Sequence, residues 1–199
     1  MKIYDISQEL LSCSVYDGDP APATGLVRSM SDGDAYNLTT LSMCVHNGTH
    51  IDAPRHFIND GNDVSAIPLD SFVGPAYIVT CNGDVDTATV TRILNKVREV
   101  NPDAARRILF RGNGVLTLDA ARFLADAGVL LVGTESQSVG PENAPMAVHL
   151  ALLSHSVVLL EGLRLSAVSD GVYFLSAQPL NIAGADGSPT RAILIDGII

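Results

Sequence analysis

Residues 46–56 read His46-Asn47-Gly48-Thr49-His50-Ile51-Asp52-Ala53-Pro54-Arg55-His56, and they contain three of the five histidines in this 199-residue chain. An aspartate lies among them, and the four side chains are spaced by four, two and four residues. Imidazole and carboxylate together are typical ligands of zinc, manganese and iron. The segment therefore predicts a metal site.

Neither a regular helix nor a straight strand brings these side chains to one ion. On a helix, Asp52 would point away from His50. On a straight strand, at ~3.3 Å per residue, His46 and His50 would lie roughly 13 Å apart, whereas ligand bonds are about 2 Å long. The backbone must therefore fold back. We predict a strand end, a turn at Asn47-Gly48 and then a loop held by Pro54.

Three groups leave a metal ion short of ligands, so further ligands are expected elsewhere. His149 lies on an expected helix over residues 146–154, and Glu161 directly follows the apolar run 157–160. A lone glutamate at a strand end is usually exposed, but beside a metal motif it is a candidate ligand. We interpret the remaining histidine, His155, as structural. A surface loop that is rich in histidine by chance is the alternative for the whole motif.

Apolar periodicity in the rest of the chain predicts alternating strands and helices. Residues 87–100 have apolar residues at helical spacing. A second helix is expected over 117–127, with Thr117 as N-cap and Gly128 as the stop, and a third over 146–154. Eight short runs predict strands: 3–6, 38–45, 76–80, 108–110, 129–132, 157–160, 173–177 and 192–195, with a loop at 16–24. The expected fold class is α/β, a single domain over residues 1–199 with a mixed β-sheet and flanking helices.

The composition argues against several classes of partner. Hydrophobic residues make up 47% and charged residues 17%, which is typical of a compact globular chain. The net charge of −10 repels phosphate backbones and anionic lipid, so we expect neither nucleic acid nor a membrane as a partner. The first residues include acids where a signal peptide would be apolar, and the three cysteines have no paired spacing. A reduced, cytoplasmic protein is predicted.

The histidine segment resembles the signature of the cyclase family of metal-dependent hydrolases, which includes bacterial kynurenine formamidase (arylformamidase) and isatin hydrolase. The resemblance covers nearly the whole chain, with further similar stretches at 5–7, 133–139, 149–163 and 179–192. It implies the swivelling β/β/α fold of that family. It also implies a homodimer or homotetramer.

The resemblance further implies two divalent metal ions, zinc or manganese, and a role for each polar side chain. Positive charge at such a site would lower the pKa of bound water toward neutrality. His56 would be the catalytic acid/base rather than a ligand. The implied ligands are His46, His50 and Asp52 for one ion and His149 for the second, with Asp52 and Glu161 bridging both.

The implied reaction is hydrolysis of a small aromatic amide, with N-formylkynurenine to kynurenine and formate, a step of tryptophan catabolism, as the reference. His56 would protonate the departing nitrogen, because an anilide anion is a very poor leaving group. Tyr16 would bind substrate, since it stands where the formamidases have a Trp that packs against the aromatic ring. This chain has no Trp, and Asp17 replaces the neighbouring Pro. The identity of the substrate therefore stays open.

Two other functions stay open: a hydrolase of a cyclic amide or ester of the isatin-hydrolase type, and a metal-binding protein without catalysis. His56 argues against metal storage, which needs no unligated histidine beside the ions. Cys44 could act as a nucleophile, but a small buried strand residue is favoured. Ser136 and Ser138 lack a nucleophile-elbow context and are interpreted as turn residues. Arg55 could bind a substrate carboxylate or be solvated.

Overall fold

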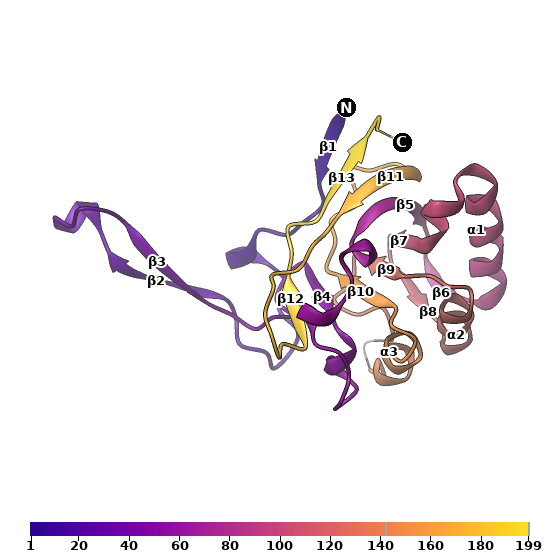
Figure 1. The fold of residues 1–199 in the computed structure, drawn as a ribbon, viewed down its shortest axis with the longest axis horizontal. Coiled ribbons are helices and arrows are strands. Elements are labelled where there is room, and N and C mark those ends of the chain that lie inside the picture. The colour runs from indigo at the N-terminus through magenta and orange to yellow at the C-terminus, as the bar shows by residue number, and fades with distance from the viewer. Residues whose placement is uncertain (142, 199) are drawn as a thin grey trace.

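The computed structural model describes residues 1–141 and 143–198, and within them nine strands form one curled mixed sheet with three α-helices along one face (Figure 1). In spatial order the strands are β1 (Lys2–Asp5), β13 (Ile193–Asp196), β11 (Gly171–Ser176), β5 (Val73–Thr80), β7 (Arg107–Arg111), β9 (Leu131–Thr134), β10 (Val158–Glu161), β4 (His50–Asp52) and β12 (Gly187–Pro189). The helices are α1 (Thr87–Val100), α2 (Leu118–Asp126) and α3 (Met146–Leu153). The predicted α/β class with a mixed sheet is confirmed.

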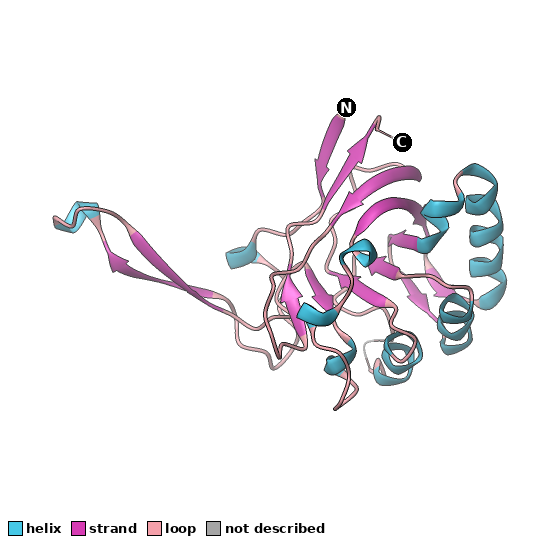
Figure 2. Cartoon of the chain, in the orientation of Figure 1, coloured by secondary structure: helices cyan, strands magenta, loops and turns pink. Residues whose placement is uncertain are grey.

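Two small strand pairs and several short 3₁₀ turns complete the chain (Figure 2). β2 (Ala23–Arg28) pairs antiparallel with β3 (Leu38–Ser42), and β6 (Gly83–Val85) pairs parallel with β8 (Gly114–Leu116). The 3₁₀ turns are η1 (Leu10–Ser12), η2 (Met30–Asp32), η3 (Pro54–His56), η4 (Val64–Ala66), η5 (Leu69–Ser71) and η6 (Pro102–Arg106).

The large sheet separates two hydrophobic cores. The helix-side core lies between the sheet and the helices and includes Leu94 of α1 and Leu124 of α2. The inner core lies on the opposite face. In β10, Leu159 belongs to the helix-side core, whereas Val158 and Leu160 belong to the inner core. This alternation, with both faces covered, explains why the central strands read as continuous apolar runs in the sequence.

Most predicted elements are present with small shifts at their ends. α1 spans the predicted residues, and Thr117 caps α2 by accepting a hydrogen bond from the Ala120 amide at 3.3 Å. The predicted strand 129–132 begins two residues later, because Leu130 instead bonds through its amide to the Arg106 carbonyl, at 2.7 Å. The predicted loop 16–24 was wrong at its end, where β2 begins. The sequence predicted no strand at the positions of β2, β6, β8 and β12.

Within the described residues, no helix combines the length and apolar character needed to cross a bilayer. The cytoplasmic location and the extent of a single domain over residues 1–199 stay predictions.

One carboxylate fastens the loop before β11 to the ends of β5 and β7. Asp170 accepts hydrogen bonds from the Thr80 amide at 3.0 Å and from its hydroxyl at 2.6 Å, and Arg111 lies 3.3 Å away. Partial burial disfavours the charged carboxylate, but these contacts outweigh it, so the pKa of Asp170 lies below its ordinary value. A lowered carboxyl pKa stabilises the fold above the unfolded-state pKa, and this stabilisation is lost as the pH falls through the folded-state pKa.

We therefore expect Asp170→Asn to lower the free energy of unfolding at neutral pH by about 1 kcal/mol, a charged hydrogen bond reduced by partial exposure. The difference from wild type should shrink in acid, where the wild-type carboxylate is protonated. Chemical denaturation at a series of pH values measures both. Asp84→Asn, at an exposed position in β6, is the control. An equal loss in acid and at neutral pH would contradict the role of the charge.

Candidate functional site

The histidine segment folds back at the predicted turn. Gly48 has a φ of +64°, in the left-handed region that favours glycine, and its amide donates to the Ser14 carbonyl at 3.2 Å. A Cβ at Gly48 would lie 2.9 Å from the Cβ of Cys13. As a result the ring centroids of His46 and His50 are 5.1 Å apart, so the two rings can serve one site. The predicted turn is confirmed.

The segment after the turn was expected to be a loop, and this was wrong. Residues 50–52 form β4, a buried strand between β10 and β12. Only a straight strand that runs from His46 to His50 is excluded, because such a strand would hold the two rings too far apart for one ion. Once the chain reverses at Gly48, a short strand can carry His50 and Asp52 on one face because their parity is the same.

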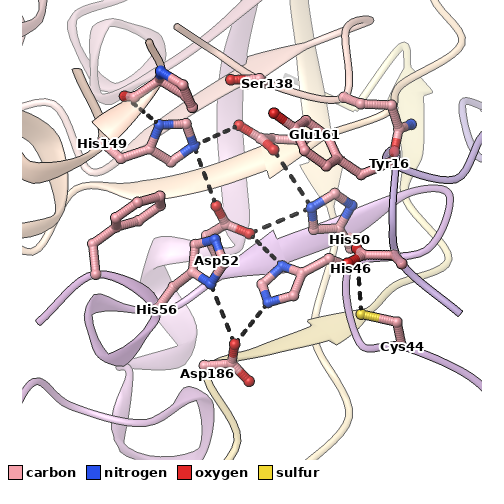
Figure 3. A pocket seen from close by; sticks show the side chains of 14 residues that line it. Tyr16, Cys44, His46, His50, Asp52, His56, Ser138, His149, Glu161 and Asp186 are labelled. Atoms are coloured by element: carbon pink, nitrogen blue, oxygen red, sulfur yellow. Dashed lines mark hydrogen bonds and ion pairs between the residues drawn. The ribbon is translucent and has the colours of Figure 1, made fainter. Parts of the chain in front are cut away.

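The strand register places the site on the helix-side face of the sheet. Ile51 belongs to the inner core, so His50 and Asp52 point the opposite way. Glu161, directly opposite His50 in the register, follows the inner-core Leu160 and therefore also faces the helices. α3 lies along this face and brings His149 to the same place (Figure 3).

Two carboxylates lie among three imidazoles in this cluster, and Asp52 contacts all three whereas Glu161 contacts two of them (Figure 3). Asp52 Oδ1 lies 2.9 Å from His46 Nδ1 and 3.4 Å from His50 Nε2. Its Oδ2 lies 3.6 Å from His149 Nε2. Glu161 Oε2 lies 3.4 Å from His50 Nε2, and its Oε1 lies 3.3 Å from His149 Nε2. Both carboxylates are placed as a bridging pair of ligands would be.

The remaining nitrogens of two rings are held by the backbone. His50 Nδ1 lies 3.0 Å from the Gly48 carbonyl, and His149 Nδ1 lies 2.9 Å from the Pro145 carbonyl. Each ring therefore donates Nδ1–H to the backbone and directs Nε2 at the carboxylates, the orientation typical of metal-binding histidines. Two groups have ligand atoms within 4.8 Å of one another: His46, His50 and Asp52, and Asp52, His149 and Glu161. This donor set fits divalent cations, and both zinc and manganese accept it.

Burial and charge shift the titration of these groups in opposite directions. Burial disfavours the charged form of His50, but hydrogen bonds to Asp52 and Glu161 raise its pKa to about 10. Burial likewise opposes ionisation of Asp52, yet His46 and His50 hold its pKa well below the ordinary value. The pKa of His149 is raised by Glu161 against the same effect of burial. The cluster therefore favours positive charge between its carboxylates.

All seven predicted site residues line one cavity of about 430 Å³, a size typical of small-molecule sites. Tyr16 and Phe57 contribute aromatic surface to its walls. The set comprises His46, His50, Asp52, His56, His149, Glu161 and Tyr16.

The sequence interpretation missed Asp186 as a site residue. Its Oδ2 lies 2.9 Å from His46 Nε2 and 3.2 Å from His56 Nδ1. Asp186 lies 130 residues beyond His56. The only sequence signal for Asp186 was that the stretch of residues 179–192 is similar to the family. β12 brings it to the site by pairing with β4.

Cys44 was expected to be a small buried strand residue, and this was wrong, because it is half-buried, lies beyond the end of β3 and lines the cavity. Burial, and Asp19 at 3.7 Å from the sulfur, raise the pKa of Cys44, so its thiol stays protonated and is a poor nucleophile. The Ser138 hydroxyl accepts from the Gly140 amide at 3.3 Å, as in a turn. Arg55 is exposed, and His155 is outside the cavity lining, its Nδ1 3.1 Å from the Ala151 carbonyl.

Comparison with known proteins gives consistent results. Residues 4–141 match a family model described as "Putative cyclase". A kynurenine formamidase of Salinibacter ruber is 37% identical over 98% of this chain and 98% of its own. A kynurenine formamidase of Bacillus anthracis is 34% identical over 97% of both chains.

Solved structures share the fold. One described as "The Structure Of Potential Metal-Dependent Hydrolase With Cyclase Activity" superposes with a TM-score of 0.81 at 28% identity, covering 100% of this chain and 99% of the other. Isatin hydrolase A from Labrenzia aggregata superposes with a TM-score of 0.81 at 22% identity, covering 98% of this chain and 94% of the other. The second similarity concerns the fold alone.

The two ligand groups predict the metal content of variants. We expect His149→Ala to lose the ion held with Glu161 while His46, His50 and Asp52 keep theirs, so bound metal falls by about half. Elemental analysis of dialysed protein measures this. His155→Ala is the matched control and should keep the wild-type content. Unchanged metal in His149→Ala would show that this histidine is not a ligand.

Proposed function

Since the chain belongs to the cyclase family, we propose that it hydrolyses a small aromatic formamide, with N-formylkynurenine as the reference substrate. The chain is a hydrolase that acts on carbon–nitrogen bonds other than peptide bonds. One observation carries the proposal. Two buried carboxylates lie among imidazoles in a cavity that also contains His56: Asp52 lies close to His46 and His149, and Glu161 lies close to His50 and His149. The relatives at 34–37% identity, named kynurenine formamidase, support it.

Divalent cations held by these residues would polarise a carbonyl group and lower the pKa of bound water. His46, His50, Asp52, His149 and Glu161 would hold two divalent ions, zinc or manganese, and Asp52 and Glu161 would be shared between them. Both carboxylates are buried, with Asp52 1% and Glu161 2% exposed, and both line the cavity. Substrate therefore approaches from the cavity, past His56.

His56 is the proposed acid/base. Its Nδ1 faces Asp186, so Nε2 is the nitrogen left to exchange a proton. As water adds to the amide carbonyl carbon, Nε2 takes one of its protons. The same proton passes to the departing nitrogen when the carbon–nitrogen bond breaks, so the products are the free amine and the carboxylic acid, which loses the second proton of the water to solvent and leaves as the carboxylate.

Tyr16 and Phe57 are the proposed contacts for the aromatic part of the substrate. Both line the cavity, and aromatic rings favour stacked or edge-on contacts with one another. Tyr16 is 40% exposed, so it lies at the open side of the cavity. A role in tryptophan catabolism and assembly as a homodimer or homotetramer stay predictions from the family resemblance.

The alternative is a cyclic amide or lactone substrate, as the name isatin hydrolase states for a protein of the same fold. The catalytic groups would be the same, and only the ring contacts would differ. A comparison of substrates, and not of the metal site, therefore distinguishes the formamide from the cyclic amide or lactone.

A substrate panel tests the proposal. Protein loaded with zinc or with manganese is assayed with N-formylkynurenine, formanilide, isatin and an aromatic lactone. We expect the formamides to be hydrolysed fastest. His56→Ala should lower turnover by about 10²–10⁴-fold, the range for loss of a general acid/base, while metal content stays at the wild-type value.

His155→Ala is the control and should retain both turnover and metal. His56, His46 and Asp186 also form a group whose ligand atoms lie within 4.8 Å of one another. Loss of metal from His56→Ala would thus make His56 a ligand and contradict its role as acid/base. Absence of hydrolysis of all four compounds by metal-loaded protein would refute the proposed function.

A further inference from the structure

Asp186 lies directly before β12, and the main chain holds it beside the candidate metal ligands. Its carbonyl oxygen accepts a hydrogen bond from the Ala53 amide at 2.9 Å. The next residue, Gly187, is opposite Asp52 in the register of β12 and β4. Because these contacts use backbone atoms, the position of Asp186 does not depend on its side chain. The carboxylate is therefore available for contacts within the site.

A single carboxylate oxygen of Asp186 contacts two imidazole rings (Figure 3). Oδ2 lies 2.9 Å from His46 Nε2 and 3.2 Å from His56 Nδ1. The centroids of the two rings are 4.1 Å apart, and their planes are inclined at 36°. Gly187 permits this arrangement, because a Cβ there would lie 2.7 Å from His46 Cε1. One oxygen thus connects a candidate metal ligand to the proposed acid/base.

His46 is oriented differently from the other two candidate ligand rings. His50 and His149 direct Nε2 at the carboxylates and place Nδ1 against a backbone carbonyl. His46 does the reverse, since its Nδ1 lies 2.9 Å from Asp52 Oδ1 and its Nε2 faces Asp186. A neutral imidazole has one N–H, and a metal ion requires the other nitrogen. His46 can therefore bind an ion through Nδ1, next to Asp52, only when Nε2 carries the proton.

The Asp186 carboxylate accepts that proton in a hydrogen bond. This contact favours the tautomer of His46 in which Nδ1 is free for an ion. A charged acceptor forms a stronger hydrogen bond than a backbone carbonyl does. A carboxylate behind a ligand histidine fixes the tautomer and orientation of the ring, and its loss typically costs about 10–100-fold in metal affinity or activity.

The ring of His56 also depends on Asp186 for its orientation. The ring contacts those of His46 and Phe57, with centroids 4.1 Å and 4.5 Å away. These ring contacts limit the movement of His56 but do not distinguish its two nitrogens. Acceptance of Nδ1–H by Asp186 does distinguish them, because it leaves the lone pair of Nε2 for proton exchange. A third group that orients the base in this way is a common feature of acid/base sites.

We propose that Asp186 is a positioning residue for both His46 and His56. Through one oxygen it fixes the tautomer of a ring that holds a metal ion and of the ring that exchanges a proton. Because both contacts converge on the same atom, the two rings are kept in one relative position. The role toward His56 rests on the proposed function, whereas the role toward His46 does not.

The alternative is that Asp186 is itself a metal ligand. Ligand atoms of His46, His56 and Asp186 lie within 4.8 Å of one another. The two roles differ in what they require of the side chain. A hydrogen-bond acceptor needs one oxygen, which the amide group of asparagine retains. Zinc in proteins is held by thiolate, imidazole and carboxylate, so an amide would not replace a ligand.

Asp186→Ala and Asp186→Asn distinguish these roles in the full-length protein. Competition with a metal chelator should show that Asp186→Ala binds zinc about 10–100-fold more weakly than wild type, with the same number of ions bound at saturation. Asp186→Asn should recover affinity, because one amide oxygen can take the place of Oδ2. Asp19→Ala, which removes another carboxylate from the cavity lining, should keep the wild-type affinity. Far-UV circular dichroism checks that each variant is folded.

The kinetic part uses zinc-saturated protein and the substrate that the panel identifies. In Asp186→Ala, kcat should fall by about 10–100-fold while KM changes little. The reason is that an unoriented His56 still permits substrate binding but seldom presents Nε2 to it. Asp186→Asn should restore part of kcat, since the acceptor for Nδ1–H returns.

Each half of the proposal can fail separately. Wild-type zinc affinity in Asp186→Ala would overturn the role toward His46, whatever the enzyme hydrolyses. A wild-type kcat at saturating zinc would overturn the role toward His56. No recovery in Asp186→Asn would overturn the acceptor role, and loss of a bound ion at saturation would make Asp186 a ligand. If wild type hydrolyses no compound of the panel, the proposed function fails, and the zinc affinity of Asp186→Ala still decides the first half.

Discussion

Two carboxylates, Asp52 and Glu161, are buried next to each other on the helix-side face of the sheet. Burial of like charges at such close range is costly unless positive charge lies between them. Here three imidazoles, those of His46, His50 and His149, lie within 3.6 Å of the carboxylates. The carboxylates raise the pKa of His50 to about 10 against the opposing effect of burial, so the site favours a cation. A divalent metal ion held by these residues would supply that charge in place of the imidazole protons.

The fold around the carboxylates keeps them in this arrangement. β4 is paired on both sides, by β10 and β12, so His50 and Asp52 cannot move without breaking the sheet. The Val139 amide donates to Glu161 Oε1 at 2.8 Å and so orients that carboxylate. The elements that carry the site are therefore also elements of the core. The hairpin of β2 and β3, which projects from the body, carries none of these groups.

Local sequence signals predicted the elements that depend on local physics. α1 and α2 have apolar residues at helical spacing and side-chain caps, and both formed as predicted. The long apolar strands were found because burial on both faces gives continuous apolar runs. β12 and β4 were not, because strands of three residues have too few positions to show a period. Their existence depends on partners far along the chain.

The sequence by itself determined the donor chemistry and the need for a turn. Imidazole and carboxylate at spacings of four, two and four cannot reach one ion without a reversal, and Gly48 is the residue that permits it. It also named His149 and Glu161, with the family resemblance assigning their roles. Only the tertiary structure decided that Glu161 faces His50, that Asp186 reaches both His46 and His56, and that the apolar strands of residues 23–42 project from the body. The contacts of Glu161 and Asp186 join residues over a hundred positions apart, and strand register, which no local pattern encodes, determines them.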